Sequence, residues 1–166
     1  MTFHLDSRNK IEDISSKIHE QPTGEMIMSG SSRMGSAGDY VFIVDYKSLD
    51  NAMHIFDASS LQYKKSVLPV GPGPEEITSI GEVCYDEGGS RFLVPDHGKE
   101  KLFVFDEGQL LQSDEFSPQN EFSLLHEGFP SQFVALNDDE VLGIMVKPTS
   151  ESTFNQCMAR YNLTSG

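Results

Sequence analysis

Two aspartates, Asp45 and Asp96, are the first candidates for chemistry because they stand at the same place in two similar stretches of sequence. Each follows an apolar run and precedes a polar turn. Carboxylates placed in this way could line a channel and hold Ca²⁺, which prefers six to eight oxygen ligands. An aspartate at a strand end more often accepts backbone N–H groups of the turn, and we favour this capping role. Asp96→Ala should then cost about 1 kcal/mol, the scale of one lost hydrogen bond.

His97 follows Asp96 and joins the two aspartates as a weak candidate for a binding site. The five histidines occur singly, without the HxH, HxxxH or CxxC spacing of a zinc site. Cys84 and Cys157 lie outside any nucleophile motif, and no GxSxG elbow is present. We expect two buried, reduced thiols. The sequence therefore predicts no catalytic residue, no metal site and no cofactor, with calcium as the open alternative.

A stiff linker, GPGPEE, lies between the two aspartates and contains Gly71, Gly73, Pro74 and Glu76. Two Gly-Pro steps fix a tight path, which suits a passage between neighbouring structural units. Its two adjacent glutamates could form a carboxylate pair for acid–base work. Neighbouring side chains of an extended segment point apart, however, so solvated charges are the expected state.

The elements that must position these residues are β-hairpins. The central hairpin, SRFLVPDHGKEKLFVFD, has two short apolar strands around a Pro-Asp-His-Gly break. The expected strands of this hairpin and of the two similar stretches are Val41–Val44, Met53–Phe56, Arg91–Val94, Leu102–Phe105, Val141–Val146 and Cys157–Tyr161. The closing residues are Asp57, Asp106 and Asn162, spaced by 49 and then 56 residues. A period near 50 built from hairpins is typical of a β-propeller.

Neighbouring residues in these strands are both apolar, which indicates burial on both faces, as in the middle of a propeller blade. The fold predicted is therefore all-β, with about three four-stranded antiparallel blades in an incomplete ring. The side chains expected to be largely buried are Phe42, Ile43, Phe92, Val94, Leu102 and Val104.

The remaining elements follow from the same pattern. We expect outer strands at Leu61–Val70 and Leu110–Phe116, and inner strands at Glu25–Ser29, Ile77–Tyr85 and Phe129–Leu136. Turns are expected at Asp86–Gly89 and Asn137–Asp139, a Gly/Ser loop at Ser29–Gly38, and a short helix or an irregular strand within Met1–Ile18. Residues 1–38 then form an N-terminal segment with the first inner strand, and residues 39–166 the propeller-like repeats, in a single domain overall.

The charge balance excludes some partners. The chain has 12 basic and 26 acidic residues and a formal net charge of −14, which repels a phosphate backbone and an anionic membrane surface. No apolar run approaches the ~18 residues of a membrane span, and Met1–Lys10 lacks the apolar core of a signal peptide. We expect neither nucleic acid binding nor membrane insertion.

The segment from Asp96 to Asp106 resembles an NHL-type propeller repeat, in which an Asp closes one strand and a basic residue, here Lys101, opens the next. Together with the GPGPEE linker, it more closely resembles TolB-like six-bladed propeller proteins of Bacteroidetes, over roughly Asp39 to Asn162. The first repeat departs from the pattern by two extra residues and by Asn51 at the basic position. The resemblance implies a periplasmic or cell-surface role with an unknown ligand.

The number of blades sets the functional expectation. At about 50 residues each, 166 residues supply about three blades, while closed propellers use about four to eight. A fragment, a pair of copies with six blades, or a remodelled third repeat would resolve the difference. We expect a binding or scaffold protein of unknown ligand, without catalysis, that forms a homodimer completing a six-bladed ring if the chain is a complete product. The alternatives are a calcium-dependent hydrolase or lactonase and a truncated fragment without independent function.

Overall fold

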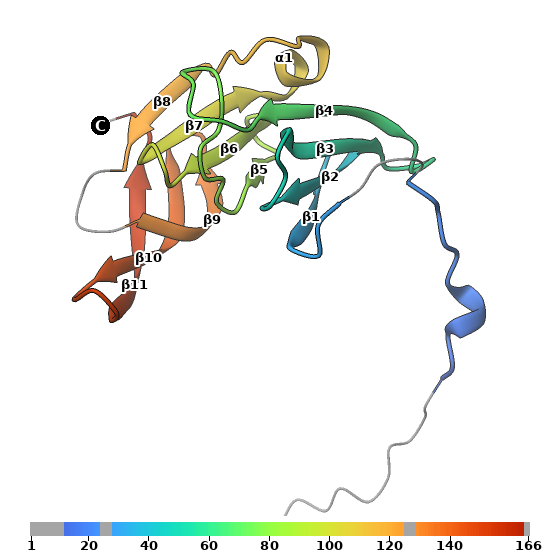
Figure 1. Cartoon of the computed structure of the whole chain (residues 1–166), viewed down its shortest axis with the longest axis horizontal. Helices are drawn as coiled ribbons and strands as arrows, with labels where there is room; N and C mark the ends of the chain where they lie inside the picture. Colours follow the sequence, from blue (N-terminus) through green and yellow to red (C-terminus); the bar gives the residue numbers. More distant parts are fainter. Residues whose placement is uncertain (1–11, 24–27, 125–128, 165–166) are drawn as a thin grey trace, which may run out of the picture.

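A computed structural model describes residues 12–23, 28–124 and 129–164. These residues form three antiparallel sheets in which each strand pairs with the next along the chain (Figure 1). Blade 1 contains β1 (Ser32–Ala37), β2 (Tyr40–Asp45), β3 (Asn51–Asp57) and β4 (Tyr63–Pro69). Blade 2 contains β5 (Cys84–Asp86), β6 (Arg91–Asp96), β7 (Lys101–Asp106) and β8 (Asn120–Ser123). Blade 3 contains β9 (Phe129–Asn137), β10 (Glu140–Pro148) and β11 (Phe154–Asn162). The predicted all-β fold with propeller-type blades is confirmed.

The three predicted hairpins are the β2–β3, β6–β7 and β10–β11 pairs, and each contains its expected strands. The third strand of every blade ends at one of the predicted closing residues, Asp57, Asp106 or Asn162. The inner strand β9 and the outer strand β4 also lie where the sequence placed them. The sequence period therefore measures the blade repeat.

Two apolar clusters join the blades, with blade 2 between the other two. Phe42 of blade 1 meets Phe92 of blade 2 edge to face, with 5.4 Å between ring centroids. Leu93, on the opposite face of β6, belongs to the cluster that includes Phe133 and Val141 of blade 3. Of the six residues expected to be buried, five are, and Ile43 is only half-buried. Ile43 and Phe42 lie on opposite faces of β2, so Ile43 points away from blade 2.

The Gly/Ser segment Ser29–Gly38 was predicted to be a loop. This prediction is wrong, because the segment contains β1. Small residues are needed here because the strand packs closely on its neighbour. A Cβ on Gly35 would lie 2.3 Å from the ring of Phe42, its partner on β2. The first strand was expected instead at Glu25–Ser29. Residues 25–27 of this range lie outside the described part of the chain, and Met28 and Ser29 are not in a strand.

The predicted outer strand at Leu110–Phe116 is wrong, because the chain forms α1 (Glu107–Gln112) there and places the outer strand later, at β8. Asp106 ends β7 and caps the helix by accepting the backbone N–H of Gln109 at 2.8 Å. The helix then buries Leu110 in the cluster between blades 1 and 2. The cap and the buried leucine both stabilise a helix at this place.

The predicted inner strand Ile77–Tyr85 is much shorter in the structure, where only β5 is regular. Ile77 and Ile80 form isolated bridges with Val70 and Asp96. The backbone N–H groups of Thr78 and Ser79 bond to a side chain, so they do not join a ladder.

The N-terminal arm, defined as residues 12–23, is exposed throughout and contains a single turn of 3-10 helix at Ser15–Lys17. It extends away from the blades from the side of the arc that carries blade 1 (Figure 1). Residues 1–11 of the predicted helix or strand lie outside the described residues. Among the residues described, no helix is long and apolar enough to span a bilayer.

Candidate functional site

The Asp96 carboxylate is completely buried at the end of β6 and is surrounded by backbone donors. It accepts four backbone N–H bonds, from Thr78 at 2.8 Å, Ser79 at 2.9 Å, Gly98 at 3.0 Å and Lys99 at 3.2 Å. The first two donors precede the inner strand of the blade, and the other two belong to the hairpin turn. Asp96 therefore fastens the entry of blade 2 to its central hairpin.

Asp45 occupies the corresponding place in blade 1. It accepts backbone N–H bonds from Ser29 at 2.8 Å and Lys47 at 3.0 Å, and a further bond from the Ser29 hydroxyl. Burial alone would raise the pKa of Asp45, but the hydrogen bonds from Ser29 and Lys47 outweigh it and hold the pKa below its usual value. Both aspartates make the contacts of a capping carboxylate. Within the described ranges, no group of three or more His, Cys, Asp or Glu side chains is arranged to hold a metal ion.

His97 is half-buried beside Asp96. Its backbone N–H donates to the carbonyl of Ser79 at 2.8 Å, and its ring lies against Gly81, where a Cβ would come within 2.4 Å of Nε2. Burial lowers the pKa of His97, although the neighbouring Asp96 opposes the shift. Asp96 and His97 therefore lie at one turn of blade 2, and Asp45 lies at the equivalent turn of blade 1.

The linker before blade 2 is held by one glutamate and one lysine. Glu76 accepts the N–H of Gly73 at 2.7 Å, and its carboxylate fills the space where a Cβ of Gly71 would lie, at 2.1 Å. Lys99 Nζ donates to the carbonyls of Gly73 at 2.6 Å, Glu76 at 2.6 Å and Pro74 at 3.3 Å.

These contacts correct one expectation from the sequence. Glu76 is not a solvated charge but part of the linker, whereas Glu75 is exposed. Lys101, the basic residue singled out by the repeat motif, pairs with Glu121 at 2.8 Å on the surface. The lysine that binds the linker is Lys99, which the motif did not mark. The sequence contained one signal for this role: two lysines, Lys99 and Lys101, follow Asp96 closely, so either could have been the one that binds the linker.

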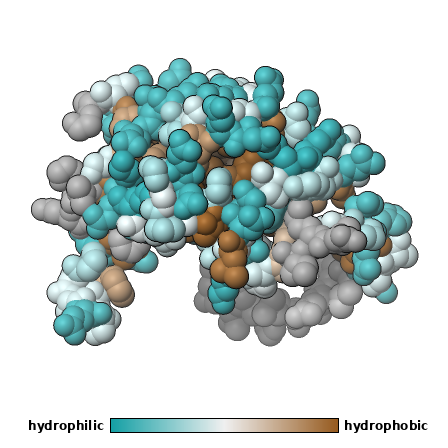
Figure 2. Space-filling model, turned by 45° about the horizontal axis from the view of Figure 1, so that its top comes forward, coloured by the Kyte–Doolittle hydropathy of each residue, from teal (hydrophilic) through white to brown (hydrophobic). Residues whose placement is uncertain are grey.

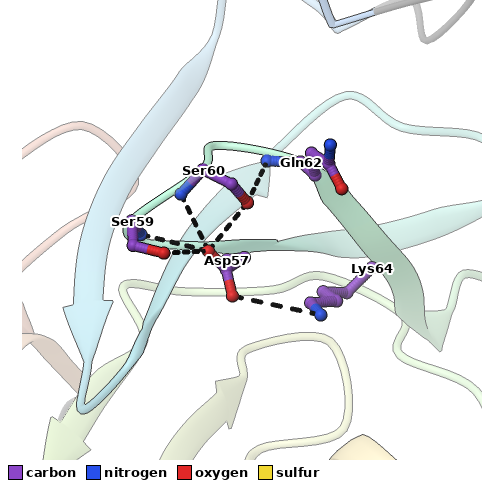
Figure 3. A network of polar contacts seen from close by, with 5 residues as sticks. All are labelled: Asp57, Ser59, Ser60, Gln62 and Lys64. Carbon is purple, nitrogen blue, oxygen red and sulfur yellow. Dashed lines mark hydrogen bonds and ion pairs between the residues drawn. The ribbon is translucent and has the colours of Figure 1, made fainter.

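Asp57 and Asp106, the strand-closing residues, are also caps. Asp57 accepts the backbone N–H and hydroxyl groups of Ser59 and Ser60, at distances between 2.7 and 3.1 Å (Figure 3). These bonds, Ser59 first, lower the pKa of Asp57, with Lys64 adding a weak ion pair at 4.0 Å. In blade 3, Asn162 takes the same role toward the N–H of Thr164 at 2.8 Å. The repeated residue at this position therefore closes each third strand.

A chain of polar contacts that runs from a buried histidine to the surface of blade 1 was not predicted. His54 is 7% exposed and its Nδ1 lies 2.7 Å from Ser66 Oγ, which in turn lies 3.0 Å from Tyr63 Oη. Burial lowers the pKa of His54, while Asp45 and Asp50 act in the opposite direction. The sequence signal was a lone histidine inside an otherwise apolar strand.

The two cysteines are free, as expected, but they are not both buried. Cys84 is half-buried, and burial raises the pKa of its thiol. Cys157 is exposed in the middle of β11. The difference arises because β11 is the outer strand of a blade that carries only three strands.

Apolar side chains that are exposed or half-buried gather on the face of blade 3 that points away from blade 2. We call this face the open face and define it by Val134, Leu142, Ile144 and Met158, of which Val134 and Met158 are exposed and Leu142 and Ile144 half-buried. Val134 is 54% and Met158 78% exposed. A cavity of about 250 Å³ lies over it, with Glu82 at the rim. One side of the molecule, in Figure 2, is hydrophilic over most of its area, with hydrophobic residues gathered in a central hollow.

No protein-family model and no curated protein match the chain. Among solved structures, a "Putative exported protein" of Bacteroides fragilis NCTC 9343 matches 74% of this chain with a TM-score of 0.55 and 17% identity. The β-propeller domain of Cps50 (Swd1) from Myceliophteria thermophila matches 85% with a TM-score of 0.46 and 14% identity. Hsv2 from Kluyveromyces lactis matches 80%, with a TM-score of 0.46 and 15% identity.

The chain spans only 32%, 41% and 47% of these three structures. At such low identity, the likeness concerns the fold alone. The chain is an all-β arc of propeller-type blades that covers less than half the length of the structures it matches.

Proposed function

We propose that this chain is a propeller-type binding or scaffold protein without catalytic activity of its own. The open face of blade 3 is the observation that supports this proposal. Contiguous exposed apolar side chains are typical of interaction surfaces, and here Val134 and Met158 lie beside Leu142 and Ile144. The best candidates for chemistry, Asp45 and Asp96, instead accept hydrogen bonds from their own backbone.

The partner that we propose for the open face is a second copy of the chain. Two arcs of three blades supply six, which lies within the range of about four to eight blades that close a ring. Like copies associate most often about a two-fold axis. In such a ring, blade 3 of each copy packs against blade 1 of the other, so both open faces are covered.

Location and family are part of the same proposal. The repeat and linker motifs resemble TolB-like and NHL-like propellers of Bacteroidetes, and the matched Bacteroides fragilis protein is named for export. We propose a periplasmic or cell-surface location on these grounds.

Light scattering coupled to size-exclusion chromatography tests the proposed dimer. We expect a mass near twice 18.4 kDa. Val134→Glu, which places a charge on the open face, should yield the monomer. Leu49→Glu is the matched control, because Leu49 is 95% exposed in the β2–β3 turn and should leave the dimer unchanged. An 18.4 kDa monomer over the whole concentration range would contradict the proposal.

Thermal melting with excess calcium and with a chelator tests the alternative of a calcium-dependent enzyme. A ligand that binds only the folded state raises its stability by mass action. We expect the same midpoint in both conditions. A midpoint that rises with calcium in the wild type but does not respond to calcium in Asp96→Asn would favour the enzyme.

A further inference from the structure

The outer edges of the three blades differ in how they are protected from pairing with another strand. β4 carries Lys64, Lys65 and Pro69, and its pairing with β3 contains a register shift. β8 is only four residues long and carries Glu121. Lysines, prolines, bulges and shortness are the devices by which edge strands avoid further pairing.

β11 has none of these devices. It runs for nine residues without lysine or proline, pairs with β10 without a register shift, and carries a single charge, Arg160. Its outer backbone groups therefore present a long, regular template for another strand.

The N-terminal arm has the pattern of a strand that lacks a sheet. Ile14 and Ile18 are 54% and 65% exposed. Successive side chains of a strand alternate between faces, so in an extended arm Ile14, Ser16 and Ile18 would share one face. Its one regular element in the described part of the chain is the 3-10 turn, and the arm includes local contacts such as the bond from Lys17 to Glu12 at 2.5 Å.

We propose that the arm of a second copy pairs antiparallel with β11 and becomes the fourth strand of blade 3. This inference rests on the proposed dimer and names the segment that completes it. One register satisfies both strands: Glu12 opposite Arg160, Ile14 opposite Met158, and Ile18 opposite Phe154.

All three pairs lie on the side of the sheet that carries the open face, because Met158 shares its row with Ile144. Phe154 and Met158 are 57% and 78% exposed, so each isoleucine covers an apolar neighbour. Directly opposed apolar and oppositely charged pairs stabilise antiparallel strands. The new pair between Glu12 and Arg160 replaces two existing ion pairs, Lys17–Glu12 and Arg160–Glu140. Both lie on the surface, where ion pairs contribute little to stability.

The second copy, rather than the same chain, supplies the arm because of where the arm leaves the blades. It extends from the side of blade 1, while β11 lies at the opposite end of the arc (Figure 1). In a ring of two arcs, blade 1 of one copy adjoins blade 3 of the other. The 13 residues between Ile18 and Ser32 can span about 40 Å when extended, which is ample for that crossing.

The native Cys157 provides a direct test, because the proposed register places Ser15 opposite it. Ser15→Cys should form a disulfide-linked dimer on mild oxidation, seen on a non-reducing gel. Ser16→Cys is the matched control: its side chain would point to the other face of the strand, so no link should form. Ser15→Cys combined with Cys157→Ser should also remain unlinked.

Three outcomes would overturn the inference. Wild-type protein that links through Cys157 alone would indicate that two β11 edges pair with each other. A Ser15–Cys157 link within one chain, found by mass spectrometry of the monomer band, would remove the second copy. Failure of Ser15→Cys to link in a protein that is dimeric by light scattering would exclude the arm while leaving the proposed dimer in place.

Dimer affinity supplies an independent measurement. Ile14→Ser with Ile18→Ser should weaken the dimer at least tenfold. Asp13→Ser with His19→Ser, which changes the opposite face of the arm, should leave the dissociation constant within about twofold. Equal affinity of the isoleucine variant and the wild type would contradict the proposed register.

Discussion

Blades 2 and 3 are built from similar hairpins but reach different degrees of burial. The strands β6 and β7 of blade 2 bury both of their faces, with Phe92 toward blade 1 and Leu93 toward blade 3. In β11 of blade 3, every residue is exposed except Ala159 and Tyr161, which are half-buried. The comparison shows that two-sided burial comes from the neighbouring blades, since the strand pairing itself is complete in both hairpins.

The hairpin turns of the two blades differ as well. Blade 2 closes its turn with the buried carboxylate of Asp96. Blade 3 has Pro148 at the end of the corresponding strand and closes its turn with threonines, by a bond from the N–H of Thr149 to the carbonyl of Thr153 at 2.9 Å and a hydroxyl contact at 2.7 Å. An exposed turn without a buried carboxylate suffices where no inner segment has to be fastened to it.

The largest expected difference between the blades is in the cost of removing an apolar side chain. Phe92→Ala should lower the free energy of unfolding by about 4 kcal/mol, because the ring is 1% exposed and packs against Phe42 and Tyr85. Met158→Ala, on the open face, should change it by less than about 0.5 kcal/mol in the monomer. Urea denaturation measures both. Equal losses would mean that blade 3 is packed as tightly as blade 2.

The turns should differ by the next largest amount. Asp96→Ala leaves four backbone donors around a buried site without their acceptor and should cost about 3 kcal/mol, more than the single hydrogen bond considered from the sequence. Thr149→Ala in blade 3 should cost less than about 1 kcal/mol. Urea denaturation of the two variants decides between them. A loss near 1 kcal/mol for Asp96→Ala would show that water replaces the carboxylate.

The linker into blade 2 offers a smaller test within one blade. Lys99→Met removes a cation from three backbone carbonyls and should cost about 2 kcal/mol. Lys101→Met removes only an exposed pair with Glu121 and should cost less than about 1 kcal/mol. Thermal unfolding of the two variants ranks them. The reverse order would mean that Lys101 contributes more to the stability of blade 2 than Lys99 does.

The smallest expected effect is a pH dependence that originates in blades 1 and 2. Burial lowers the pKa of His54 and of His97 below the usual value near 6.5. The unfolded chain therefore takes up protons first, and stability present above about pH 6.5 is lost as the pH falls toward the pKa values of the folded state. His54→Gln should flatten the slope of the melting midpoint between about pH 7.5 and 5.5. An unchanged slope would assign the dependence to His97 or to other groups.

The sequence by itself determined the strands of all three hairpins, their period and the residues that close them. Runs such as LFVF and VFIV are apolar on both faces, and a polar turn follows each first strand, beginning with an aspartate in blades 1 and 2, so these elements follow from local pattern alone. The capping roles of Asp45 and Asp96 were expected for the same reason, since an aspartate at a strand end meets backbone donors a few residues away.

Only the tertiary structure decided which segments take the inner and outer positions of each blade. Ser32–Ala37 has the composition of a loop. It forms a strand next to β2, where the ring of Phe42 occupies the space that a side chain on Gly35 would fill. The chain after Asp106 forms a helix, in which Leu110 packs into the apolar cluster between blades 1 and 2. Whether Cys157 and Met158 are exposed likewise depends on what lies beside β11, because burial of a sheet face or edge is a property of its neighbours and not of its own residues.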